Sequence, residues 1–131
     1  MEEVQYKVVN SEIAQKLLLD LGIYPDKKGY LYLLAAIQYF RDRTKKISKI
    51  YSLVGNTFGK KAINVERCIR FSVMKAYFSS AFTKLNKCFD AEIFKKDTYL
   101  SNGDFISMIA TYLDMISAPN MKVVSLDRKF E

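Results

Sequence analysis

One stretch decides the fold: VGNTFGKKAINVERCIR, residues 54–70. Its spacing is that of a helix-turn-helix, in which the first helix needs a small residue at the close approach and the turn needs a residue that tolerates positive φ. Gly55 and Gly59 stand at these two positions. We expect the second helix to begin near Lys61 or Ala62. The seam between the two helices should then contain Val54, Phe58, Val65, Cys68 and Ile69.

The second helix separates a packing side from an outward side, because successive residues turn by about 100°. The packing side carries Val65, Ile69, Ser72 and Ala76, and the outward side carries Ile63, Arg67, Arg70 and Met74, with Asn64 and Glu66 on the flanks. Arginine reads guanine, asparagine reads adenine, a carboxylate accepts from cytosine, and an apolar side chain contacts a thymine methyl. The pattern predicts a DNA reader. The alternative is an ordinary amphipathic helix with a solvated basic face, since this spacing also recurs by chance.

The positive charge of the chain is concentrated on the same segment. Ten basic residues lie between positions 41 and 75: Arg41, Arg43, Lys45, Lys46, Lys49, Lys60, Lys61, Arg67, Arg70 and Lys75. Only Asp42 and Glu66 oppose them, so this segment has a net charge of +8 in a chain of +7, and the remainder is −1. Charge gathered on a single segment favours binding to the phosphates of nucleic acid over a general role in solubility.

Catalytic and metal chemistry find little support in the sequence. The chain has no histidine, which removes Ser-His-Asp and Cys-His catalysis. The carboxylates are scattered singly, and no glycine-rich phosphate loop is present. Cys68 and Cys88 lack the short spacing of a metal knuckle and are interpreted as reduced structural thiols. We therefore expect a protein that is not an enzyme, with no catalytic residue, no cofactor and no metal.

Length and hydropathy predict one cytoplasmic domain over residues 1–131. The chain has 131 residues and is 50% hydrophobic, enough for a substantial core. It has no apolar run of about 18 residues and no secretion leader, so we expect no membrane contact. The helical periodicity predicts an all-α fold of about six helices that includes the helix-turn-helix. Residues 4–9 and 121–126 are rich in β-branched side chains, which is compatible with short terminal strands or with disordered ends.

Individual helices can be delimited by their apolar stripes and their caps. A helix after Ser11 has the stripe Ile13, Leu17, Leu18 and Leu21 and stops at Gly22. A long second helix follows, with the stripe Tyr30, Leu33, Leu34, Ile37 and Phe40. The helix that carries the outward-facing arginines is expected to run to about Ser80, and a short helix over Phe82, Leu85 and Phe89 comes next. Ser101 and Asp104 are expected to cap the last helix, and Pro119 to end it.

Several runs of residues resemble the C-terminal effector domain family of the sporulation response regulator, stage-zero sporulation protein A. They are Lys28-Gly29-Tyr30-Leu31-Tyr32-Leu33, Ala36-Ile37, Ile47-Ser48-Lys49-Ile50, Val65-Glu66-Arg67-Cys68-Ile69-Arg70 and the run from Ser101 to Ala110. The resemblance covers about residues 17–113, and residues 1–10 and 119–131 are terminal extensions. It implies an all-helical domain whose helix-turn-helix reads short promoter boxes, often as head-to-tail pairs, to activate or repress transcription.

The resemblance also implies roles for single positions. Glu66, Arg67 and Arg70 match the family's recognition-helix residues, with Lys60, Lys61 and Asn64 at its start. Phe71 replaces a family histidine, Lys75 replaces an apolar residue, and Lys60-Lys61 replace small hydroxyl residues, so we expect an altered sequence preference. Only about 16 residues precede the shared region, so the receiver domain of the family regulator, and its control by phosphorylation, are expected to be absent.

Two functions remain open at this point. The first is a stand-alone transcription regulator that binds double-stranded DNA, with RNA polymerase and a homodimer on tandem sites as further partners. In it, the base-reading residues are Asn64, Glu66, Arg67 and Arg70, and the phosphate-binding residues are Lys45, Lys46, Lys49, Lys60, Lys61 and Lys75. The second is a protein-interaction module of the same fold that acts on another regulator or on RNA polymerase. Retention of both arginines beside a glutamate favours the first.

Overall fold

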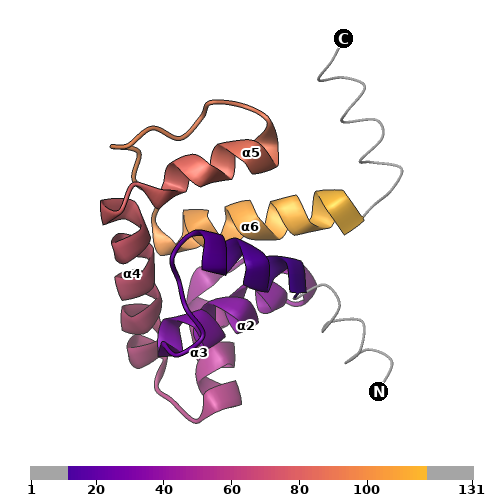
Figure 1. The fold of residues 1–131 in the computed structure, drawn as a ribbon. Helices are drawn as coiled ribbons and strands as arrows, with labels where there is room; N and C mark the ends of the chain where they lie inside the picture. The colour runs from indigo at the N-terminus through magenta and orange to yellow at the C-terminus, as the bar shows by residue number, and fades with distance from the viewer. Residues whose placement is uncertain (1–11, 118–131) are drawn as a thin grey trace.

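The computed structural model describes residues 12–117, which form a stack of helices and no strand (Figure 1). Residues 12–20 are helical. The helices that follow are α2 (Lys28–Asp42), α3 (Ile47–Phe58), α4 (Ala62–Phe78), the 3₁₀ helix η1 (Ala81–Leu85), α5 (Asn86–Phe89) and α6 (Asn102–Ser117). The prediction of an all-α fold of about six helices is confirmed. The expected terminal strands, residues 4–9 and 121–126, lie outside the described residues.

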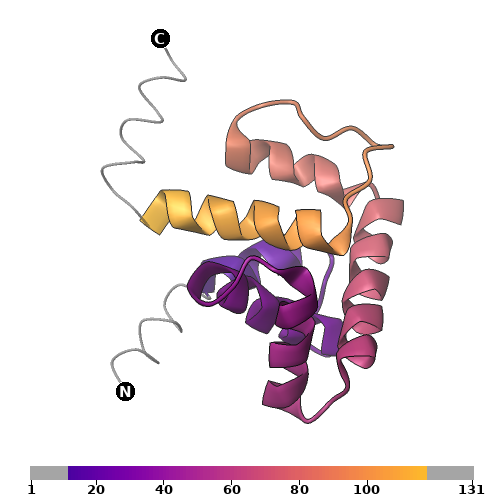
Figure 2. The same ribbon diagram turned by 180° about the vertical axis from the view of Figure 1, so that it is seen from behind.

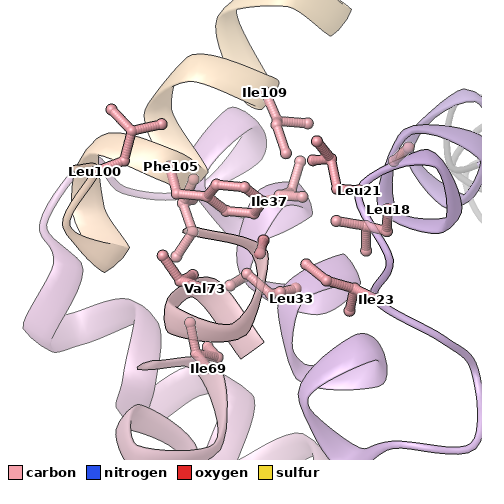
Figure 3. Packing of buried hydrophobic residues seen from close by; sticks show 14 of the residues in the cluster. Leu18, Leu21, Ile23, Leu33, Ile37, Ile69, Val73, Leu100, Phe105 and Ile109 are labelled. Atoms are coloured by element: carbon pink, nitrogen blue, oxygen red, sulfur yellow. The ribbon is translucent and has the colours of Figure 1, made fainter. Parts of the chain in front are cut away.

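The central helix of the fold is α2, which packs against α3, α4 and α6. Both views show α4 standing along one side of the molecule and α6 lying across it (Figures 1 and 2). Leu33 and Ile37 of α2 lie in the middle of the core, with Leu18 approaching from one side and Phe105 from the other (Figure 3). One buried cluster therefore fixes the relative positions of α2, α4 and α6.

The first helix packs through a stripe that differs by one position from the expected one. Ala14, Leu18 and Leu21 are buried, Leu17 is half-buried, and Ile13 is 41% exposed. Positions 14, 18 and 21 repeat at helical spacing, whereas position 13 is turned about 100° away. The expectation that Ile13 belongs to the buried stripe was wrong, because the small Ala14 takes the place next to the core.

The ends of two later helices also test the expected caps. The backbone N–H of Asp104 donates to Ser101 Oγ at 3.1 Å, which confirms the predicted cap of α6. Helix α4 ends at Phe78 rather than at Ser80. Ser80 adopts a left-handed conformation with φ +62°, and this reverses the chain into η1.

Arg41 belongs to the contact between α2 and α6. Its Nε atom donates to Asp114 Oδ1 at 2.6 Å, and its side chain is only 7% exposed. Its Nη1 atom is buried and has no hydrogen-bond partner among the described residues. Arg41 was counted in the basic segment, but it stabilises the packing of two helices and is not part of an exposed basic surface.

Removing the carboxylate of Asp114 should therefore destabilise the fold. The Asp114→Asn variant leaves the buried guanidinium of Arg41 with a neutral partner, and we expect the free energy of unfolding to fall by about 1–3 kcal/mol. Asp97→Asn makes the same change at an exposed position outside the helices and should stay within about 0.5 kcal/mol of the parent. Urea unfolding followed by circular dichroism measures both. Equal midpoints for the two variants would contradict a structural role for this ion pair.

Candidate nucleic-acid interface

Helices α3 and α4 are joined by a tight turn at Gly59. Gly59 has φ +67°, a conformation that glycine adopts without the steric cost of a side chain. Its N–H and that of Lys60 both donate to the carbonyl of Gly55, the latter at 2.8 Å. Helix α4 begins at Ala62, as expected. The prediction of a left-handed glycine in this turn is confirmed.

Gly55 allows the turn to approach α3 closely. A Cβ atom at this position would collide with the carbonyl oxygen of Lys60 and would lie 3.5 Å from the backbone nitrogen of Ala62. The expectation of a small residue here is confirmed. What lies against Gly55 is the backbone of the turn that leads into α4, so the start of α4 is positioned by the lack of a side chain at this residue.

The seam between α3 and α4 is largely the expected one. Val54, Val65 and Ile69 are fully buried, and Cys68 is half-buried. Phe58 is a correction, because it is 36% exposed and lies at the rim with its ring centroid 5.3 Å from that of Tyr32. As the last residue of α3, it contacts α2 at the edge of the molecule and does not enter the seam.

The proposed base-reading residues share the outer surface of the first half of α4. Asn64, Arg67 and Arg70 are exposed, whereas Glu66 is half-buried. Arg70 Nη1 lies 3.1 Å from Glu66 Oε2, one helical turn away. The carboxylate and the guanidinium thus form a favourable ion pair on the helix surface.

Asn102, at the start of α6, holds the same turn of α4 from behind. Its Nδ2 atom donates to the hydroxyl of Tyr51 at 3.0 Å and to the carbonyl of Glu66 at 3.3 Å, and the residue is 9% exposed. Burial and Glu66 raise the pKa of Tyr51, while the hydrogen bond from Asn102 and the charge of Arg70 act in the opposite direction. The sequence pattern indicated a cap at Ser101 but gave no sign of this bond, which joins positions 36 residues apart.

The six proposed phosphate-binding lysines are exposed but do not form one group. Lys60 and Lys61 immediately precede α4. Lys46 is the residue just before α3, at the other end of this helix of 12 residues and about 18 Å away. Lys45 is tied to the end of α2, because its Nζ donates to the carbonyl of Phe40 at 2.8 Å and lies 4.4 Å from the centre of that ring. The lysines thus lie at both ends of α3, with Lys49 on its first turns and Lys75 on α4.

Metal binding, a membrane-spanning helix and a reactive thiol each have little support in the described part of the chain. Residues 12–117 contain no group of three or more side chains suited to hold a metal ion, and none of their helices is long and apolar enough to cross a membrane. Cys68 and Cys88 are free and half-buried. Burial, with a further contribution from Asp20, raises the pKa of Cys88, so its thiol stays protonated and is a weak nucleophile near neutral pH.

Comparison with protein families identifies the family of this chain. Residues 14–113 match the family described as sporulation initiation factor Spo0A C terminal. The match covers most of the chain and includes every base-reading and phosphate-binding residue expected from the sequence. The family consists of DNA-binding effector domains of response regulators that control transcription in sporulation. The chain belongs to the Spo0A C-terminal family of DNA-binding sporulation regulator domains.

Proposed function

We propose that this protein is a sequence-specific transcription regulator in which α3 and α4 act as a helix-turn-helix and α4 enters the major groove. The observation that carries the proposal is the exposed surface formed by Asn64, Arg67 and Arg70 on the first half of α4. Recognition helices of this type contact base edges with their N-terminal residues. The second half of α4 would then point out of the groove.

Each residue on this surface has a role that its chemistry suggests. Arg67 and Arg70 would donate to O6 and N7 of guanine, and Asn64 would make the paired bonds that adenine offers. Glu66 would act mainly on base choice, by accepting from cytosine or by orienting Arg70 through their 3.1 Å contact. Replacement by glutamine is expected to alter sequence preference and to strengthen binding to random DNA, since a carboxylate near phosphates is repelled.

The lysines would bind phosphates and set the register without reading sequence. If the six expected lysines neutralise roughly six phosphates, the slope of log affinity against log salt is about −5. We therefore predict duplex binding that weakens by roughly three orders of magnitude between 50 and 200 mM salt. Fluorescence anisotropy with a labelled duplex measures this slope, and a value near zero would remove the electrostatic basis of the proposal.

Selection of bound fragments from random duplex DNA tests base reading itself. The purified chain is expected to enrich a short motif that contains guanine, and the Arg67→Ala variant should enrich a weaker or shorter one. Salt-dependent binding without any enriched motif would leave only non-specific attraction. In that case, regulation of particular promoters by this chain alone would be ruled out.

One observation favours a second function, that of a protein-interaction module acting on RNA polymerase or another regulator. Phe71, Met74 and Phe78 form an exposed apolar stripe along the second half of α4, and both phenylalanines are 73% exposed. Exposed apolar patches are common at protein interfaces. A homodimer on tandem sites would use such a surface as well. Loss of DNA binding in the parent chain, together with stable binding to polymerase, would favour this second function.

A further inference from the structure

A pocket of about 270 Å³ lies beside α4, between the turn after the first helix and the beginning of α2. Its lining includes Ile23, Lys27, Lys28, Gly29, Phe71 and Lys75. None of the expected base-reading residues lines this pocket. Lys27 and Lys28 were not among the expected phosphate-binding residues.

Close packing of α2 on α4 fixes the rim of this pocket. A Cβ atom at Gly29 would collide with Ser72 Oγ and would lie 2.9 Å from the carbonyl oxygen of Cys68. The absence of a side chain at Gly29 therefore lets the first turn of α2 rest directly on the flank of α4. Lys27 and Lys28, which begin this turn, are held at a fixed place beside α4.

The rim is cationic and the floor is apolar. Lys28 and Lys75 are exposed, and no carboxylate of residues 12–117 lies within ion-pair distance of either. Lys27 lies 3.7 Å from Asp26, but both side chains are more than half exposed, so this contact is weak. Ile23 is buried beneath the pocket and Phe71 forms an exposed wall. An apolar floor below a positive rim fits the carbon-bound face of a sugar ring beside its phosphate.

The pocket lies on one flank of the proposed reading surface. Asn64, Phe71 and Lys75 are spaced by seven and four residues, so they follow one line along α4. The carbonyl of Glu66 accepts from Asn102 and Arg70 pairs with the Glu66 carboxylate, so both residues lie on the opposite flank. A helix in the major groove has a sugar-phosphate backbone on each side, because the groove is only about 12 Å wide.

We propose that this pocket is a second phosphate-binding edge, in which Lys27, Lys28 and Lys75 hold successive phosphates of the strand that passes on the Asn64 side. The ligand is duplex DNA, and the inference rests on the proposed function. The six lysines alone give a slope of about −5; with Lys27 and Lys28 included, about eight phosphates are neutralised and the expected slope of the parent chain is about −7. These two lysines strengthen binding to any sequence and do not read bases.

The test compares two double variants that remove the same charge. Lys27→Ala combined with Lys28→Ala should return the salt slope to about −5 and weaken preferred and random duplexes by the same factor. The control is Lys95→Ala combined with Lys96→Ala, an exposed adjacent pair in the loop between α5 and α6. It should leave the slope within a few tenths of the parent. Circular dichroism checks that both variants remain folded.

The outcomes separate this inference from the proposed function. If the parent chain binds DNA and both double variants keep its slope, the pocket does not hold a phosphate although the proposed function stands. An equal loss of slope in the two variants also overturns the inference, because net charge alone then explains the effect. If the folded parent chain binds no duplex at low salt, the proposed function fails first, and the inference fails with it.

Discussion

Arg67→Ala and Arg70→Ala are each expected to cost about 1–3 kcal/mol of binding free energy at a preferred duplex and much less on random DNA. This corresponds to about a 5- to 150-fold loss of affinity. Both guanidinium groups are exposed on the first half of α4, where a recognition helix meets base edges. An arginine that binds guanine adds affinity only where that guanine is present, so its removal should reduce discrimination between duplexes.

Titrations of a preferred and a random duplex at one salt concentration measure this difference. Arg43→Ala is the matched control, since it removes the same charge from an exposed residue at the end of α2. We expect it to weaken the two duplexes alike, and only slightly. Equal losses on both duplexes for the Arg67 and Arg70 variants would show that these arginines contact only phosphate.

Gly55→Ala is expected to lower the free energy of unfolding by about 1–3 kcal/mol, in the manner of an overpacked core. The new methyl group collides with the carbonyl oxygen of Lys60, which belongs to the backbone and cannot rotate away. The turn must therefore shift, and the start of α4 moves with it. We expect DNA affinity to fall as well, because Lys60 and Asn64 follow directly after this contact.

The control for this substitution is another glycine. Gly103 lies in the first turn of α6, and a Cβ atom there meets nothing within 4 Å. Gly103→Ala should be neutral or should stabilise the fold by about 0.4–1 kcal/mol, since alanine loses less entropy on folding. Urea unfolding of the two variants side by side gives the comparison. If both variants were equally stable, the close approach at Gly55 would have no energetic importance.

The local part of the fold is predictable from the sequence. The roles of Gly55 and Gly59 in the turn, the burial of Val65, Ile69 and Ala76 and the cap at Ser101 all follow from residues within a few positions of one another. Such features depend on backbone geometry and helical periodicity, which any short segment reveals. The exposure of Asn64, Arg67 and Arg70 on α4 is likewise predictable from helical periodicity. On the packing side of α4 the expectation was wrong at one position, because Val73 is buried and Ser72 is half-buried.

Contacts between distant positions are not predictable in this way. Arg41 pairs with Asp114 across 73 positions, and Asn102 reaches Glu66 across 36. Lys27 and Lys28 come beside Lys75 only because Gly29 lets α2 rest on α4. The charge count of residues 41–75 included Arg41 and left out Lys27 and Lys28. A charge count does not show which helices pack against each other.

The most direct measurement is an amide chemical-shift titration of the labelled chain with a preferred duplex. If α4 enters the major groove, the largest changes fall on residues 60–71, with smaller ones at Lys27 and Lys28 on the flanking pocket. The amides of α5 and of the second half of α6, which lie on the other side of the core, should change little (Figure 1). Changes confined to α5 and α6, with residues 60–71 unaffected, would contradict DNA reading by α4.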